Sequence, residues 1–197
     1  MSIADKALLL KKDFDDVYEA GRKSFMEDYQ QGGNRNNYTY AFAGQGWTDE
    51  TYDPIYDIVC TGSAQTMYGN AKITSTKKTI DWSNATSTNY AFSSCPSLIE
   101  IVLLIVSKTT PYHTSTFSGL TNLVEMRMGG TLGQNGFDIS KATKLSVESL
   151  LSILHALENK STDTSGTSWV CTLGTENLAK LSDSQKAIAT QKGWSLI

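Results

Sequence analysis

One pattern occurs twice in the chain, and this repeat restricts the fold more than any other feature. Residues 90–103 and 115–128 align without a gap, 25 positions apart. The matched pairs are Phe92 with Phe117, Leu98 with Leu123, Glu100 with Glu125, Ile101 with Met126 and Leu103 with Met128. A repeat this short cannot bury its apolar face alone, so neighbouring copies must stack to form a core.

Two weaker copies flank the clear pair. The same step taken backwards from Phe92 and Leu98 reaches Met67 and Ile73, and residues 137–145 form the start of a degenerate last copy. Three copies is about the minimum for a stable stack. We therefore expect a stack over residues 64–145.

The repeat resembles the leucine-rich repeats of the BspA surface-antigen type. The matching positions are Ala91, Phe92, Cys95, Leu98, Ile101 and Leu103. This resemblance implies a short solenoid with a parallel sheet, and similar repeats present a binding face in bacterial surface proteins and phage structural proteins. The run 99–106 is more apolar than an exposed strand should be, which suggests that both of its faces are covered.

Composition narrows the class of protein. The chain has 197 residues, of which 40% are hydrophobic, and this suffices for one medium domain with an appendage. The net charge is −3, and lysine and arginine do not cluster with aromatic residues, which argues against nucleic acid as a partner. The start of the chain has no signal-peptide layout, and no apolar run approaches 18 residues, so we expect a protein made in the cytoplasm with no membrane partner.

Residues suited to catalysis or metal binding are few. Cys60, Cys95 and Cys171 are odd in number and widely spaced, so we interpret them as core residues. His113 is expected in a surface loop and His155 beside the core of a helix. These residues give no catalytic, cofactor-binding or metal site, and we expect no enzyme activity and no cofactor.

The acidic residues do not form a convincing catalytic pair either. Asp15 and Asp16 lie in an N-terminal helical segment, and Glu100 and Glu125 occupy equivalent positions of the repeat. A ladder along the stack explains the two glutamates better than general acid–base chemistry does.

Residues 1–33 form the first predicted region. Ser2 and Asp5 can cap a helix that continues to about Tyr29. The positions of its heptad seam alternate spacings of four and three, as in a coiled coil, and they are Ile3, Ala7, Leu10, Phe14, Val17, Gly21 and Ser24. The alternative is a helix that packs on its own domain through the same stripe.

Residues 34–63 are rich in aromatic side chains and are expected to cap the first repeat. The aromatic residues are Tyr38, Tyr40, Phe42, Trp47, Tyr52 and Tyr56. Such a group can cover the open end of a stack, where strand edges and apolar surface would otherwise be exposed. The functional alternative is a platform on which a sugar ring stacks.

Residues 146–197 are expected to form a C-terminal α/β cap. Val147, Leu150, Leu151, Leu154 and Leu157 mark one face of a first helix, with Ser146 and Ser149 as capping residues. Residues 169–174 read as a strand, 182–193 as a helix opened by a capping box, and 194–197 as a final strand. The predicted fold class is therefore α+β.

Both ends of the chain resemble structural proteins of phages and prophages of gut bacteria. The resemblance rests on residues 17–21, 33–38, 41–47 and 173–194. It implies a non-enzymatic virion protein that is held by other virion proteins through its N-terminal helix and presents the repeats to a bacterial surface protein or glycan. The alternatives are a cell-surface adhesin and a glycan-degrading fibre enzyme.

Self-association through the N-terminal seam is the first testable expectation. We expect the intact protein to be a homo-oligomer, with a trimer favoured, and a truncated chain that begins at Asn34 to be monomeric, because the truncation removes the apolar seam. Light scattering gives both masses. Equal monomeric masses would show that the segment packs on its own domain or binds another protein.

Overall fold

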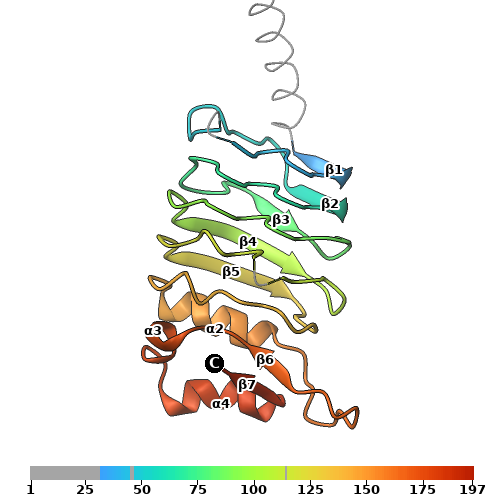
Figure 1. Cartoon of the computed structure of the whole chain (residues 1–197), viewed down its shortest axis with the longest axis vertical. Helices are drawn as coiled ribbons and strands as arrows, with labels where there is room; N and C mark the ends of the chain where they lie inside the picture. The colour runs from blue at the N-terminus through green and yellow to red at the C-terminus, as the bar shows by residue number, and fades with distance from the viewer. Residues whose placement is uncertain (1–31, 45–46, 114) are drawn as a thin grey trace, which may run out of the picture.

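The computed structural model describes residues 32–44, 47–113 and 115–197. The predicted coiled-coil helix of residues 1–29 lies outside these residues. In the described part, strands follow one another down the long axis in chain order, and the helices gather at the C-terminal end (Figure 1). The chain therefore builds its long axis one strand at a time.

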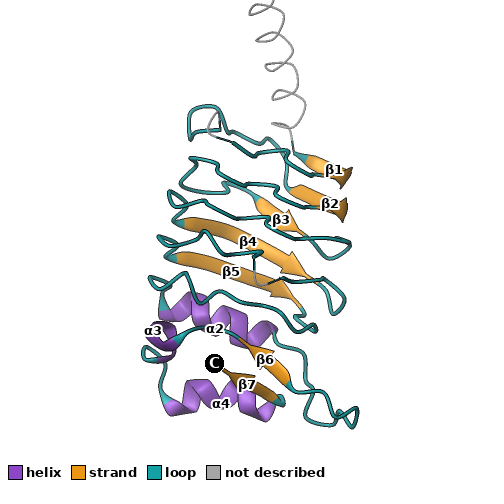
Figure 2. Ribbon diagram, in the orientation of Figure 1, coloured by secondary structure: helices purple, strands orange, loops and turns teal. Residues whose placement is uncertain are grey.

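The main sheet has five strands in the order β1-β2-β3-β4-β5, and every neighbouring pair is parallel. The strands are β1 (Gly33–Asn37), β2 (Ile58–Ser63), β3 (Thr79–Asp81), β4 (Glu100–Val106) and β5 (Glu125–Gly130). A segment of turns connects the end of each strand to the start of the next one (Figure 2). We call residues 33–130 the stack, and one strand with its return segment a unit.

The register of the stack follows the alignment of the two clear copies. Glu100 pairs with Glu125, and Ile101 pairs with Met126. Between Ile101 and Leu104 the register of β4 shifts at a bulge, so that Leu104 rather than Leu103 pairs with Met128. The gap-free alignment was wrong at Leu103, because a bulge adds one residue to one strand without changing the turns on either side.

The bulge also decides how the apolar run of β4 is buried. Ile101, Leu104 and Val106 point into the core, whereas Val102, Leu103 and Ile105 are only half-buried. The expectation that both faces of this run are covered therefore holds only in part. The outer face of β4 keeps part of its apolar surface in contact with solvent.

A column of aromatic rings runs through the core. Phe42, Tyr68, Phe92 and Phe117 stack in succession, with ring centroids 5.0, 5.1 and 6.0 Å apart, and Phe137 follows at 5.2 Å. The predicted equivalent of Phe92 was Met67, which is buried but lies one residue away from the column. Register in the return segments is set by ring stacking, and Tyr68 supplies the ring that Met67 lacks.

The predicted inward positions of the two clear copies are confirmed. Leu98, Ile101, Leu123 and Met126 are all buried, and Ile73 of the upstream copy is buried with them.

The aromatic residues of 34–63 divide into two groups. Tyr38, Phe42, Trp47 and Tyr52 are buried, while Tyr40 and Tyr56 are exposed.

Helix α2 (Val147–Ala156) takes the place of a sixth strand and covers the open edge of β5. The Ser149 and Ser152 hydroxyls accept hydrogen bonds from the backbone N–H groups of Met126 and Met128, at 2.8 and 2.6 Å. Unpaired strand edges invite association with another chain, so these two serines end the sheet. Ser146 caps the helix as predicted.

The buried face of α2 differs from the predicted one. Ile153 and Ala156 are buried with Leu150 and Leu154, and Ser149 takes a fifth inward position. Val147 and Leu151 are only partly buried. His155, expected beside the core, is exposed. The prediction followed leucine alone, whereas the helix turns its serines to the strand edge and shifts the apolar face accordingly.

The remaining elements close the C-terminal end. They are β6 (Trp169–Cys171), α3 (Thr175–Leu178), α4 (Asp183–Gln191) and β7 (Trp194–Leu196), and β6 pairs in parallel with β7. The capping box of Ser182 and Gln185 is present, as predicted. The predicted strand 169–174 ends early at Cys171, and α3 was not predicted.

Among the described residues, no helix has the length and apolar character needed to cross a membrane.

The buried leucines provide a test of the register. Leu98→Ala and Leu123→Ala should each lower the free energy of unfolding by about 2–5 kcal/mol, because each leaves a cavity between units. Ile99→Ala is the matched control, since Ile99 adjoins Leu98 but is 47% exposed. Chemical denaturation measures all three. Equal losses for Leu98→Ala and Ile99→Ala would contradict the register.

Candidate binding surface

Four return segments lie in register beside one another. Segments 38–44, 64–70, 88–94 and 113–119 are matched by backbone hydrogen bonds from one unit to the next, such as those from Tyr40 N to Gln65 O and from Thr66 N to Asn89 O. In a parallel ladder, an N–H group binds the carbonyl that precedes its partner residue. Tyr40, Thr66, Tyr90 and Ser115 therefore form one column, which we call the tyrosine column.

The backbone of this column is unusual. Tyr40, Thr66 and Tyr90 have φ angles of 58°, 52° and 57°. The left-handed region is disfavoured for residues with a side chain, and bulky or β-branched residues are true outliers there. Asparagine or glycine would adopt this backbone with less strain, so packing of the backbone does not explain why tyrosine occurs twice.

The two tyrosine side chains point away from the core. Tyr40 is 58% exposed and Tyr90 is 47% exposed, although both follow the same column as the half-buried Thr66 and Ser115. Two strand spacings separate the backbones of Tyr40 and Tyr90, which is about 10 Å. The column thus holds two aromatic side chains at a fixed interval along the long axis.

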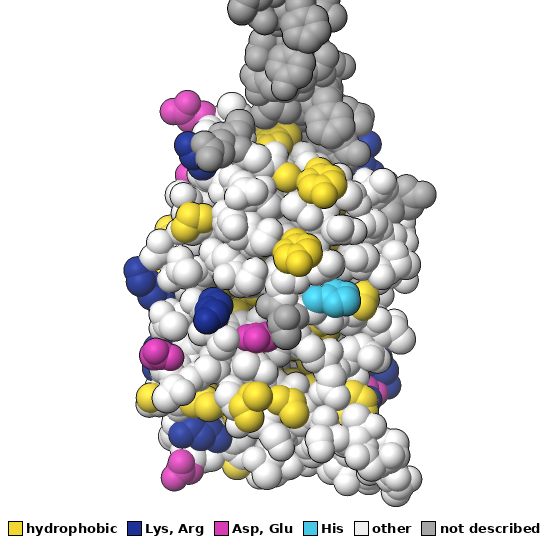
Figure 3. All heavy atoms as spheres, in the orientation of Figure 1, with side chains coloured by type: hydrophobic (Ala, Val, Ile, Leu, Met, Phe, Trp, Pro, Cys, Tyr) yellow, Lys and Arg dark blue, Asp and Glu magenta, His cyan; other side chains and the backbone are white. Residues whose placement is uncertain are grey.

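Hydroxyl and amide groups surround the column. Ser115 donates a hydrogen bond to the Asn89 side chain at 2.6 Å, and the Thr39 and Ser63 hydroxyls lie 2.6 Å apart. The four aligned segments contain no lysine, arginine, aspartate or glutamate. The face drawn in Figure 3 is mostly neither charged nor apolar, and its hydrophobic, basic and acidic side chains are scattered. This chemistry suits an uncharged ligand that offers hydroxyl groups.

A shallow groove follows a second column of the turns, whose residues lie four positions after those of the tyrosine column. It has a volume of about 490 Å³. Its lining includes Asn70, Ser94 and Gly119, which are equivalent in consecutive units, together with Ala71, Lys72, Pro96, Ser97 and Thr121. Gly44, Asn70 and Ser94 repeat a left-handed backbone, with φ angles of 94°, 63° and 53°. The groove therefore arises from the same turn geometry as the tyrosine column.

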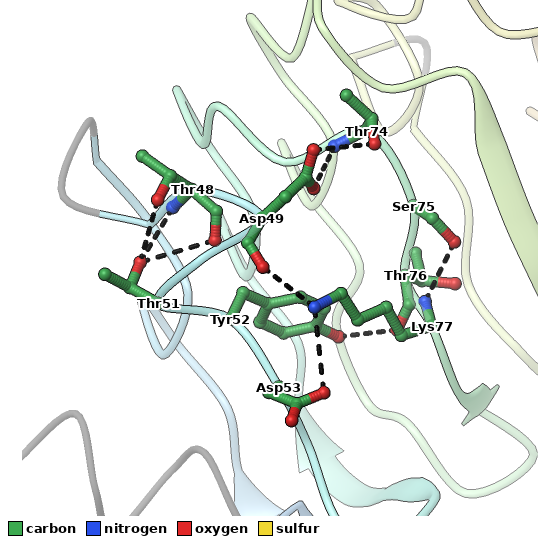
Figure 4. A network of polar contacts seen from close by, with 9 residues as sticks. All are labelled: Thr48, Asp49, Thr51, Tyr52, Asp53, Thr74, Ser75, Thr76 and Lys77. Carbon is green, nitrogen blue, oxygen red and sulfur yellow. Dashed lines mark hydrogen bonds and ion pairs between the residues drawn. The ribbon is translucent and has the colours of Figure 1, made fainter.

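The polar network shown in Figure 4 joins the first two units. Asp49 accepts hydrogen bonds from the backbone N–H and the hydroxyl of Thr74, both at 2.7 Å. Lys77 donates to the Asp49 carbonyl at 2.8 Å and lies 3.6 Å from Asp53, which is 76% exposed. The Asp49 carboxylate is thus occupied by Thr74, and an exposed ion pair contributes little. We interpret this network as a structural link between units.

Below this network, two buried tyrosines share a hydrogen bond. Tyr52 donates its hydroxyl proton to the Thr76 carbonyl at 2.8 Å, and it accepts a hydrogen bond from the Tyr68 hydroxyl, which is 2.7 Å away. Burial raises the pKa of Tyr52 and that of Tyr68 well above the ordinary tyrosine value. Both hydroxyls are therefore neutral near pH 7, and neither is suited to act as a base.

The glutamates of the repeat are explained by the ladder. Glu100 accepts a hydrogen bond from Ser75 at 2.6 Å, and Glu125 accepts one from Ser146 at 3.0 Å. Each carboxylate thus binds a hydroxyl of the adjacent unit or of the N-cap of α2. This arrangement agrees with the ladder interpretation of Glu100 and Glu125.

The cysteines and histidines do not come together. Cys60, Cys95 and Cys171 are free and buried, as predicted, and burial raises the pKa of Cys95 to about 12. His113 is exposed in its loop, as expected. Within the described ranges, no three His, Cys, Asp or Glu side chains are grouped closely enough to hold a metal ion.

The tyrosine column was missed at the sequence level, although a signal for it exists. The tripeptide Tyr-Ala-Phe occurs at 40–42 and again at 90–92. The first occurrence was assigned to a cap and the second to a repeat, so the two tyrosines were not compared. Searches against protein-family models, curated proteins and solved structures found no match.

The buried Tyr52–Tyr68 pair predicts a loss of stability at alkaline pH. Because the pKa of both hydroxyls is raised in the folded state, the unfolded chain loses these protons first, starting near the ordinary pKa of about 10. The free energy of unfolding should therefore be constant on the neutral side and fall as the pH rises above about 10.

Tyr52→Phe separates this effect from other causes. The variant should lose about 1 kcal/mol at neutral pH with the hydrogen bond to Thr76, and its stability should fall less steeply above pH 10, since one buried phenol is gone. Tyr56→Phe is the matched control, because Tyr56 is 61% exposed. Thermal melts across the pH range measure both. A parallel fall for the parent and Tyr52→Phe would refute the assignment.

Proposed function

We propose that the protein is a non-enzymatic structural component of a phage particle, and that it presents a short leucine-rich-repeat domain to the bacterial surface. The observation that carries this proposal is the tyrosine column, in which two exposed aromatic side chains are held on a strained backbone at equivalent positions. Residues kept in disfavoured backbone regions cluster at functional sites.

The stack supports the proposal because it is built as a rigid platform. Backbone hydrogen bonds join each unit to the next, and the ring column fills the space between them. A binding face on such a scaffold loses little conformational entropy when a ligand binds. Because the four aligned segments contain no lysine, arginine, aspartate or glutamate, binding at the tyrosine column should also depend little on salt.

The route of attachment follows from the sequence. The heptad seam of residues 1–29 would associate with copies of itself and with other virion proteins, and β1 begins shortly after it, at Gly33. The stack would then project from the anchor along its long axis. In this arrangement the tyrosine column lies on a side of the projecting domain.

The main competing proposal is a fibre enzyme that cleaves a glycan. Such an enzyme needs two carboxyl groups that face each other across a cleft. Asp49 and Asp53 lie four residues apart on one loop, but the Asp49 carboxylate binds Thr74 and Asp53 is exposed. These contacts favour a structural role for both residues.

Two measurements test the proposal. Gold-labelled antibody against the whole protein should mark a fixed position on purified particles, and incubation of the protein with host capsule or cell-wall polysaccharide should release no new reducing ends. Label confined to cell envelopes would support the adhesin alternative instead. New reducing ends, lost on replacement of Asp49 or Asp53 by Asn, would establish an enzyme.

A further inference from the structure

The two exposed tyrosines of the tyrosine column are spaced along the long axis of the stack. Tyr40 and Tyr90 lie in the first and third of four consecutive segments, with Thr66 between them and Ser115 after them. Their backbones are about 10 Å apart along the long axis. A ligand that touches both tyrosines must therefore be extended and lie along the stack.

The chemistry of the column favours a carbohydrate. An aromatic ring packs against the apolar C–H face of a sugar, and side-chain hydroxyls and amides bind the sugar hydroxyls. Both kinds of group are present, since Thr39, Gln65, Asn89 and Ser115 occupy the same segments as the tyrosines and are only half-buried. The four segments carry no lysine, arginine, aspartate or glutamate, and His113 is the single histidine among them, so the ligand need not be charged.

We infer that Tyr40 and Tyr90 bind one extended, uncharged glycan strand, with two non-adjacent sugar rings stacked on the two tyrosines. In an extended β-1,4-linked chain, alternate rings turn the same face to one side, and one ring spans about one strand spacing. The ring between them lies over Thr66, whose smaller side chain leaves room for it. This inference rests on the proposed binding face and names its ligand.

The unusual backbone supports this assignment. A tyrosine in the left-handed region turns its side chain out of the turn, where it is 58% exposed at Tyr40 and 47% at Tyr90. A third exposed tyrosine, Tyr56, is 61% exposed but lies outside the column and has an ordinary backbone. It provides a control that removes an exposed ring without touching the proposed site.

Binding to defined oligosaccharides tests the inference. The probes are hexamers, trimers and dimers of β-1,4-linked glucose, mannose and N-acetylglucosamine, with a hexamer of galacturonic acid as the charged comparison. Calorimetry on the whole protein should show binding of at least one neutral hexamer, similar affinity for its trimer, and much weaker affinity for its dimer, which cannot reach both tyrosines. The affinity should not change with salt, because no charge is involved.

Substitution identifies the residues. Tyr40→Asn and Tyr90→Asn should each weaken hexamer binding about tenfold, the equivalent of one aromatic contact, and reduce it towards that of the dimer. Asparagine tolerates the left-handed backbone, so neither variant should melt below the parent. Tyr56→Ala should bind as the parent does.

The outcomes separate the inference from the function on which it rests. Binding of the hexamer that is unchanged in Tyr40→Asn and Tyr90→Asn, or failure of every neutral hexamer to bind the folded parent, overturns the glycan assignment. If these two variants still lose adhesion to host cells, the face binds a different component and the proposed function stands. If particles lack the protein altogether, the proposed function fails, even where the oligosaccharides bind.

Discussion

The parallel hydrogen-bonded ladder between units is the constraint on which the rest of the structure depends. Once one unit is set beside the next, each position along the chain becomes a column that runs the length of the stack. The inward column of rings from Phe42 to Phe137, the ladder of hydroxyls and carboxylates around Glu100 and Glu125, and the outward tyrosine column are consequences of this one register. A change in register would disrupt all three together, which makes the register strongly specified.

A stack of this kind also has to end, and the C-terminal end shows how. Helix α2 runs beside β5, and Ser149 and Ser152 supply the hydrogen-bond acceptors that another strand would have provided. Lys192, which follows α4, then donates to the carbonyls of Leu154, His155 and Leu157 at the end of α2. The helix replaces a strand on one side and has its own last carbonyls satisfied from the other.

The parts of the fold that were predictable from the sequence include those in which adjacent units carry identical residues at equivalent positions. Leu98 over Leu123 and Glu100 over Glu125 needed only the repeat, and the capping box of Ser182 needed only local chemistry. The failures have a common physical cause. A bulge moved Leu104 into the place of Leu103, and a one-residue shift put Tyr68 in the place of Met67, because packing tolerates changes in spacing that a fixed period does not.

The candidate site was harder to predict because its signal is conformational. Nothing in the letters Tyr-Ala-Phe shows that the first tyrosine has a positive φ, whereas glycine at that position would have marked a turn. The strain is informative for the same reason. A backbone that disfavours bulky side chains occurs in one column at Tyr40, Thr66 and Tyr90, and the two aromatic residues in it remain 58% and 47% exposed. This exposure agrees with the binding role that we propose for the two tyrosines, and it distinguishes them from Phe42 and Phe92, the buried rings two residues further along the chain.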